Sequence, residues 1–510
     1  MRTANNKLID WEITIIPIIC IFSMAFFFFI YPQKSNLLLG QIRLVLGDTF
    51  GAYYLLIGLG VFLISLYLAF SSYGNIVLGN KSENPRYSFW TWGAMMFTCG
   101  LAADILFYSF SEWVMYASDP HITELGTIQN WAGVFSLFHW GFIPWAFYLV
   151  LAASFGFMLH VRKRNRQKFS EACRPILGKW VDGKLGKVID LFSVFALLAG
   201  TATTFSVATP LMAVIIETLT GLQISRTLIT IGIIIITFVV YTYSLLYGIK
   251  GISRLSDWCM YLFFGLLVFV GLLCGENRYI IETGLQSFGT MLNHFIELAT
   301  YADPLRTSSF PQNWTIYYWS YWMVWSIAAP FFIGKISRGR TIRQLILGGY
   351  LFGVGSTCIS FIVLGNYSMG IQMTGQEDFI SMYQSGVNIY DMIISMIYMM
   401  PYPMVVLSWL VITMVAFYAT SFDSIAFIAS CYSYHRLEEG SYPSRKIEFI
   451  WCVLLIVLPI ALLFSESSMA NIQSVSIIAA FPLGIIIGVI IIGFIKDAGA
   501  FLMERNKRLL

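Results

Sequence analysis

Apolar residues fall into long runs along this chain, and shorter polar segments separate the runs. Each run approaches the roughly 20 residues that an α-helix needs to cross the hydrocarbon core of a bilayer. The first run, 13–30, is long enough to span and lacks a small-residue cleavage site, so it does not resemble a cleavable signal peptide. The pattern predicts twelve transmembrane helices, near 12–31, 51–71, 89–110, 131–159, 188–216, 227–248, 257–274, 314–334, 345–365, 399–432, 447–464 and 474–495.

Two further segments are not expected to cross. In 279–300 the apolar positions recur at steps of three and four, and polar residues fill the remaining positions, which predicts a helix lying in the membrane interface. These apolar positions are Ile281, Leu285, Phe288, Leu292 and Phe295. Segment 366–398 is more polar, and we expect it to form a loop and a short helix before span 10.

Composition and charge place the chain in a membrane. It is 58% hydrophobic and 11% charged, whereas soluble domains carry roughly 25% charged residues. If the N-terminus is cytoplasmic, all but five of the 31 basic residues fall on the cytoplasmic side, as the positive-inside rule requires. The five exceptions are Lys34, Arg43, Arg226, Arg278 and Arg306. Both termini are therefore expected in the cytoplasm.

The sequence offers little support for a catalytic or metal centre. Its eight cysteines form no CxxC pair and its five histidines are dispersed, so we expect no metal site or bound cofactor. The acids Asp104, Glu112, Asp257 and Asp423 lie in separate spans without a catalytic pattern. A channel would show repeated pore segments, which are not found. A transporter-like membrane sensor stays open as an alternative, although no soluble signalling domain is recognisable.

The third span contains the first chemical irregularity. Its segment FTCGLAADILFY (97–108) places small residues and Asp104 in the middle of a membrane helix. An ionisable residue at that depth costs a few kcal/mol even on the insertion scale. One interpretation is a close helix crossing in which Asp104 is hydrogen-bonded to a neighbour. The other is a partly unwound helix that lines a substrate cavity, where irregular backbone is tolerated.

Aromatic residues gather in the middle of two other spans, although Trp and Tyr usually lie at the membrane–water boundary. Span 4 contains LFHWGFIPWAFY (137–148), with Trp140, Trp145 and Tyr148. Span 8 contains NWTIYYWSYWMVWS (313–326), in which steps of four, four and three place on one helical face Trp314, Tyr318, Trp322 and Trp325.

Such a stripe alone is also typical of ordinary helix packing. Two aromatic clusters together with a buried carboxylate favour a different interpretation, because several ring faces around one cavity form a cage for a cation that cannot donate hydrogen bonds. A quaternary ammonium is such a guest, and a desolvated ring contact is worth up to about 2 kcal/mol.

The segments FHWGFIPWAFY, NWTIYYWSYWMVW and KISRGRT (335–341) resemble signatures of the betaine/carnitine/choline transporter family, in part its carnitine/γ-butyrobetaine antiporter branch. The resemblance implies an all-α membrane protein with two inverted repeats of five helices (spans 3–7 and 8–12), each beginning with a broken helix. The implied division is 1–88 for two peripheral helices, 89–278 and 314–495 for the repeats, 279–313 for the interfacial helix and 496–510 for a short cytoplasmic tail. It also implies a homotrimer in the bacterial cytoplasmic membrane, with the interfacial helix between subunits.

Family roles can be assigned to matching positions. The central aromatic box matches Trp140, Trp145, Tyr148 and Trp322, and Trp325 matches a ring below the box on the cytoplasmic path. Trp314 would lie toward the outer side. Tyr321 stands where close relatives have Trp, which implies a slightly more polar box. Asp104 occupies the third small position of the Gly-rich segment, where Gly resembles betaine carriers and Asp resembles choline-type members.

The coupling ion is less clear. Segment FYATSFDS (417–424) matches a family sodium site, with Phe417, Thr420 and Ser421 as the corresponding residues, although such hydroxyls also satisfy helix backbone. The sodium-independent exchangers replace the ions with an Arg in span 7 and a Met in span 8. Here those positions are Cys259 and Ala329, which argues against exchange without ions. Asp104 offers another route, by binding a proton or by pairing with the substrate.

These observations predict a secondary active transporter for trimethylammonium compounds such as choline, carnitine or glycine betaine, not an enzyme. The alternative is a carnitine/γ-butyrobetaine-type antiporter without ion coupling. The expected partners are the small-molecule substrate, the lipid bilayer and Na⁺ or H⁺ as coupling ion, and no nucleic acid.

Overall fold

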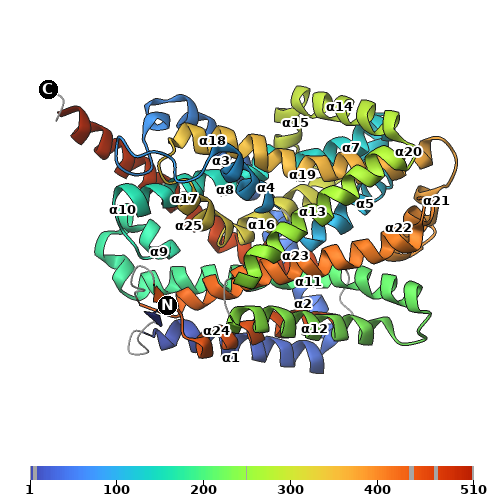
Figure 1. The fold of residues 1–510 in the computed structure, drawn as a ribbon, viewed down its shortest axis with the longest axis horizontal. Helices are drawn as coiled ribbons and strands as arrows, with labels where there is room; N and C mark the ends of the chain where they lie inside the picture. Colours follow the sequence, from blue (N-terminus) through green and yellow to red (C-terminus); the bar gives the residue numbers. More distant parts are fainter. Residues whose placement is uncertain are drawn as a thin grey trace.

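The computed structural model describes residues 2–3, 9–100, 102–247, 250–435, 441–464 and 469–507. Within these ranges, the side chains of 2–3, 243–247, 250–257, 423, 441–442, 464 and 506 are not described, so Asp257 and Asp423 lie outside the described side chains. The described chain is a bundle of helices, most of them running along its long axis (Figure 1). A short parallel pair joins the strands β1 (Arg2–Thr3) and β2 (Ser441–Tyr442).

The helices of the first half run from the N-terminus to the interfacial segment. They are α1 (Trp11–Ile30), α2 (Pro32–Arg43), η2 (Leu44–Thr49), α3 (Gly51–Phe70), η3 (Ser72–Asn75), α4 (Phe89–Thr98), α5 (Ala103–Ala117), α6 (Pro120–Leu125), α7 (Ile128–His139), α8 (Phe142–Gly156), η4 (Phe157–Val161), α9 (Phe169–Ala172), α10 (Arg174–Leu177), η5 (Gly178–Asp182), α11 (Lys184–Thr220), α12 (Arg226–Tyr247), α13 (Lys250–Leu273), α14 (Asn277–Asn293) and α15 (Phe295–Thr300).

The second half begins at the aromatic segment of span 8. Its helices are η6 (Pro311–Thr315), α16 (Ile316–Trp325), α17 (Ala329–Ile336), α18 (Ile342–Gly349), η7 (Tyr350–Val354), α19 (Gly355–Ser360), η8 (Phe361–Gly365), α20 (Asn366–Met373), α21 (Phe379–Gln384), α22 (Ile389–Tyr398), α23 (Pro403–Tyr432), α24 (Arg445–Phe464) and α25 (Met469–Lys507).

Each of the twelve predicted spans coincides with a helix or a chain of helices. Eight of these segments are long and apolar enough to cross a membrane on their own. Span 3 passes the same test as the bent pair α4 and α5, and span 7 as α13 joined to α14. In span 6, the part of the helix with described side chains is the shorter segment 226–242. Span 8 is divided into α16 and α17. The all-α membrane fold is confirmed.

The connecting segments contain more helix than the sequence indicated. Segment 366–398 holds α20, α21 and α22, so span 9 continues beyond residue 365 and two short helices precede span 10. The interfacial segment 279–300 is helical, bends at His294 and turns 110° from α13. Its outward positions include Ile281 and Leu285, 58% and 72% exposed, whereas Phe295 is buried.

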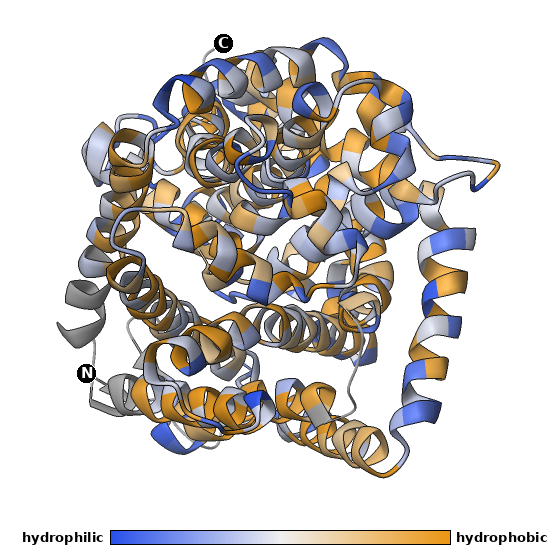
Figure 2. Cartoon of the chain, turned by 90° about the vertical axis from the view of Figure 1, so that its right-hand side faces the viewer, coloured by the Kyte–Doolittle hydropathy of each residue, from blue (hydrophilic) through white to orange (hydrophobic). Residues whose placement is uncertain are grey.

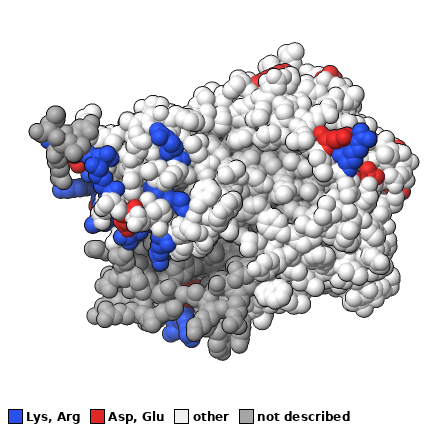
Figure 3. All heavy atoms as spheres, turned by 45° about the horizontal axis from the view of Figure 1, so that its top comes forward, with Lys and Arg blue, Asp and Glu red and all other residues white. Residues whose placement is uncertain are grey.

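The surface has the distribution of polarity that a bilayer requires. In the lower half of Figure 2, helices seen nearly end-on are predominantly hydrophobic. Figure 3 shows charged side chains gathered toward the two ends of the molecule, with an uncharged belt between them. Lys and Arg collect at the end where Figure 1 places both termini.

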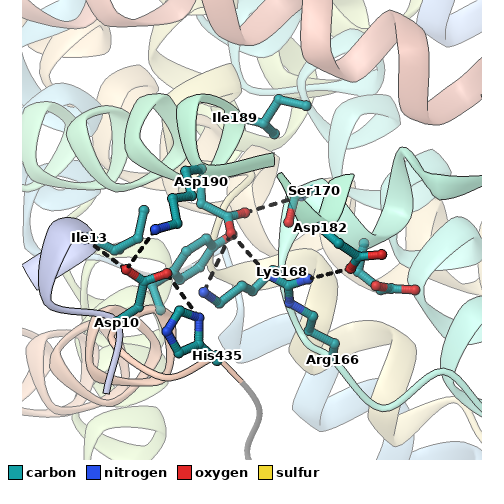
Figure 4. Close-up of polar contacts among 12 residues, drawn as sticks. Asp10, Ile13, Arg166, Lys168, Ser170, Asp182, Ile189, Asp190 and His435 are labelled. Carbon is teal, nitrogen blue, oxygen red and sulfur yellow. Dashed lines mark hydrogen bonds and ion pairs between the residues drawn. The ribbon is translucent and has the colours of Figure 1, made fainter. Parts of the chain in front are cut away.

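A buried ionic network closes that end (Figure 4). The Lys168 ammonium is 2% exposed and lies 3.4 Å from a carboxylate oxygen of Asp190 on α11. Burial lowers the pKa of Lys168, and the Asp190 carboxylate opposes this shift without cancelling it. Asp10 caps α1, with one oxygen 3.2 Å from the His435 ring. The network therefore joins α1 to the loop before α9 and to the ends of α11 and α23.

We predict that Asp190→Asn destabilises the fold by about 3–5 kcal/mol, because it leaves the buried Lys168 ammonium unpaired. Lys168→Met should cost less, since Arg166 still lies 3.8 Å from Asp190. The double variant should recover part of the loss. Unfolding of the detergent-purified protein, followed by tryptophan fluorescence, measures these effects.

The matched control is Glu282→Gln, because its pair with Arg278 is 63% and 87% exposed. Removing such a pair should cost less than about 0.5 kcal/mol. Equal losses of unfolding free energy for Asp190→Asn and Glu282→Gln would show that the buried network contributes no more to stability than an exposed ion pair.

Candidate functional site

The site begins at a break in span 3. Helices α4 and α5 are bent by 68° relative to each other, and the described residues between them, 99, 100 and 102, are not helical. Ala102, the residue before α5, has extended backbone angles. Gly100 lies against Trp145, and a Cβ at this glycine would be 2.6 Å from the Trp145 ring. The break therefore lets backbone approach an aromatic ring closely, and it places Asp104 in the first turn of α5.

A second break orients the aromatic residues of span 4. Helix α7 ends at His139, Trp140 follows as its cap, and α8 begins at Phe142. Trp145 and Tyr148 are three residues apart on α8, which places them on the same helical face. Their ring centroids are 5.6 Å apart.

The Trp322 ring on α16 joins these side chains into one cluster. Its centroid lies 5.7 Å from Trp140, 6.0 Å from Trp145 and 5.0 Å from Tyr148. All four residues are buried, with 0–4% of their surface exposed. The Trp322 indole N–H has no hydrogen-bond partner within the described chain. The structure thus brings together the four residues of the predicted aromatic box.

Residues of span 9 pack against the aromatic box. Gly353 lies against Trp145, and a Cβ at Gly353 would be 2.4 Å from that ring. The Thr357 hydroxyl accepts the Trp145 indole N–H at 3.4 Å and lies 2.6 Å from the Trp140 carbonyl oxygen, to which it donates. A glycine and a threonine one turn apart thereby fix one wall of the box.

Asp104 and Tyr321 form a separate polar pair beside the box. The Tyr321 hydroxyl donates to one Asp104 oxygen and lies 2.5 Å from the Thr204 hydroxyl on α11. The other Asp104 oxygen is buried without a partner among the described residues. The Tyr321 ring contacts Tyr317 and Trp325, not the four rings of the box. Tyr321 therefore binds Asp104 instead of adding a polar edge to the box.

The structure adds Glu112 to this region and places it on α5 together with Asp104, so the expectation that these two acids lie in separate spans was wrong. The Glu112 carboxylate accepts the Trp140 indole N–H at 3.1 Å and also accepts the Tyr318 hydroxyl. A signal in the sequence was available, because Asp104, Tyr108 and Glu112 recur every four residues on α5.

The remaining predicted residues lie on both sides of the box. Trp325 is half-buried and 6.4 Å from Tyr321 between ring centroids. Trp314 contacts the Tyr116 ring at 4.9 Å, at the opposite end of the stripe from Trp325.

The predicted cation residues lie where α23 meets α13. The Thr420 hydroxyl is 3.1 Å from the Phe417 carbonyl oxygen and 3.9 Å from the Cys259 sulfur. Phe417 is buried, and Thr420 and Ser421 are half-buried. Cys259, the position at which the exchangers carry Arg, therefore borders Thr420 directly. Ala329 is the first residue of α17.

Comparisons with known proteins identify a matching family and several relatives. The family described as BCCT, betaine/carnitine/choline family transporter, matches residues 12–500. The glycine betaine transporter OpuD of Bacillus subtilis is 30% identical, with 86% of this chain and 85% of that protein covered. The carnitine transporter of Acinetobacter baumannii is 28% identical, with coverage of 84% and 78%.

The high-affinity choline transport protein of Escherichia coli is 27% identical, with 92% of this chain and 69% of that protein covered. These relatives are membrane transporters and not enzymes. This chain belongs to the betaine/carnitine/choline transporter family.

Proposed function

We propose that the chain is a secondary active transporter of trimethylammonium compounds, such as choline, carnitine or glycine betaine, and that it works by alternating access. The observation that carries this proposal is the Trp322 ring in contact with the rings of Trp140, Trp145 and Tyr148. An ammonium without N–H groups needs ring faces, and a buried ring contact contributes up to about 2 kcal/mol. Relatives named for carnitine, glycine betaine and choline support the same substrate class.

The charge of Asp104 is what distinguishes between the substrates of this class. Choline has no carboxylate, so an ionised Asp104 beside the box offsets its positive charge. The carboxylate of betaine or carnitine is repelled by an ionised Asp104 unless that carboxylate points away or Asp104 holds a proton. Tyr321 already donates to one oxygen of Asp104, which leaves the other oxygen for a cation or a proton.

Sodium is the coupling ion that we favour, bound at Phe417, Thr420 and Ser421. Hydroxyl and carbonyl oxygens suit a hard cation. The neighbouring Cys259 thiol carries no guanidinium that would replace the ion, so exchange without ions is the weaker candidate.

We also propose a homotrimer in the bacterial cytoplasmic membrane, with both termini in the cytoplasm. Lys and Arg gather at one end of the molecule (Figure 3), the end at which Figure 1 places the termini, which agrees with the positive-inside rule. The apolar outward residues of α14, Ile281 and Leu285, are suited to contacts with a neighbouring subunit.

Uptake of labelled choline, carnitine and betaine into proteoliposomes, with Na⁺ and pH gradients imposed separately, tests the proposed function. Trp322→Leu removes the central ring and serves as the negative control for uptake. Failure of all three compounds to enter or to bind would refute the substrate class.

We predict that Gly353→Ala weakens substrate binding about tenfold, a loss of about 1.4 kcal/mol. The new methyl group would displace Trp145 from the box, because a Cβ there lies 2.4 Å from the ring. Quenching of tryptophan fluorescence measures the Kd. Gly355→Ala is the matched control, since its Cβ would meet nothing within 4 Å. Equal affinities for the two variants would contradict the assigned role of Trp145.

Asp104→Asn should weaken choline about tenfold and change betaine less than about twofold, because it removes a negative charge that only choline needs. Competition binding of both compounds at two pH values measures this difference. If Asp104 is merely a structural hydrogen-bond partner of Tyr321, both compounds will be affected equally.

The double variant Thr420→Ala/Ser421→Ala should lose Na⁺ stimulation of uptake at fixed substrate. Cys259→Arg should lose it too, because a guanidinium would occupy the place of the ion. Thr413→Ala on the same helix is the control, since the Thr413 hydroxyl donates to the Trp409 carbonyl oxygen. Wild-type uptake that ignores Na⁺ would remove this site and leave proton coupling or exchange.

A further inference from the structure

A stripe of protonatable residues runs along α5, which is buried throughout its length. Asp104, Tyr108, Glu112 and Tyr116 recur every four residues and so share one face of the helix. Helix α16 and its preceding turn face this stripe. Besides the Asp104–Tyr321 and Glu112–Tyr318 bonds, the hydroxyls of Tyr108 and Tyr317 are 3.0 Å apart, and Tyr116 contacts Trp314.

Glu112 is the member of this stripe that touches the box. One of its oxygens accepts from Trp140 and Tyr318, and the other is buried without a partner among the described residues. The titratable groups around it are Tyr108 and Tyr116 on α5, His139 on α7 and Tyr318 on α16. No described Lys or Arg forms an ion pair with Glu112.

Tyr116 extends the environment of Glu112 toward His139. Its hydroxyl is 2.7 Å from Nδ1 of His139. Nε2 of the same histidine is 3.0 Å from the Thr315 hydroxyl. The Tyr116 hydroxyl, one turn after Glu112 on α5, is therefore hydrogen-bonded to the His139 ring.

A buried carboxylate with no cation beside it is costly, and such a group usually takes up a proton instead. The hydrogen bond from the Trp140 N–H is charge-assisted when Glu112 is ionised, and it is then roughly twice as strong as a neutral one. The protonation state of Glu112 consequently decides how firmly one wall of the aromatic box is held.

We propose that Glu112 is a proton-binding positioning residue: its ionised form fixes Trp140 for an ammonium guest, and its protonated form releases that ring. This inference rests on the proposed function, because the guest is the trimethylammonium group. Glu112 acts through Trp140, so its effect extends to choline and betaine alike, whereas Asp104 distinguishes between them.

The central test is the pH dependence of the betaine Kd between about pH 5.5 and 8.5. In an Asp104→Asn background, affinity should rise about tenfold with pH, because the ionised carboxylate favours the bound state. Adding Glu112→Gln should remove this dependence, since the amide still accepts from Trp140 but does not ionise. An unchanged pH profile in the Glu112→Gln variant would overturn the proposal.

Proton release provides a second measurement. If betaine favours ionised Glu112, binding must release protons into weakly buffered solution at the lower pH values, by linkage. A pH dye should detect release from Asp104→Asn protein and none after Glu112→Gln is added. Release that persists in the double variant would assign the proton to another group and refute the proposal.

Infrared spectroscopy tests the proton without any substrate. The C=O stretch of a protonated carboxyl should be present in Asp104→Asn protein at low pH and lost on Glu112→Gln. Should Glu112→Gln fail to fold, Tyr318→Phe removes one donor to the carboxylate and should move the midpoint of this band to higher pH. Absence of the band in folded protein, or an unmoved midpoint, would refute proton binding, whereas failure of betaine to bind would refute the proposed function alone.

Discussion

Hydrocarbon offers no hydrogen-bond partner, so a polar group in a span is costly unless the protein itself supplies one. Between α5 and α16 this constraint is met by Asp104 and Glu112, whose carboxylates accept hydrogen bonds from tyrosine hydroxyls on α16. In the repeat division that the sequence resemblance implies, α5 and α16 belong to the first helices of the two repeats. Under that division, the contacts of Asp104 and Glu112 would join the two repeats.

The aromatic box depends on that arrangement. Trp140 is held by Glu112, and Trp145 lies between Gly100 and Gly353, whose lack of a side chain permits the close approach of backbone and ring. A broken helix is needed for this geometry, because a continuous helix would not turn by the 68° that separates α4 from α5. The aromatic box thus depends on the small residues, because the irregular backbone at these residues leaves space for the rings.

Much of the fold was predictable because hydropathy reports directly on the bilayer. The twelve apolar runs correspond to helices, and the glycine and acid in span 3 indicated the break. The site was less predictable. Periodicity shows that Tyr321 lies on α16. It does not show that the Tyr321 hydroxyl reaches Asp104 on α5. Glu112 was overlooked for the same reason, since its partners Trp140 and Tyr318 are distant in sequence. The helices α21 and α22 are too short to produce a clear pattern.

In the function that we propose, Asp104 and Glu112 contribute differently to the binding of a cation in a buried site. Ring faces attract an ammonium without requiring hydrogen bonds, but they do not neutralise its charge. Asp104 lies at the start of α5, where the helix dipole favours a negative charge. Glu112 lies two turns further along, where the dipole contributes little and a proton or the bonds from Trp140 and Tyr318 must compensate its charge instead. Position along one helix thereby gives the two acids different surroundings, and in our proposal Asp104 faces the charge of the substrate while Glu112 holds the Trp140 ring that receives it.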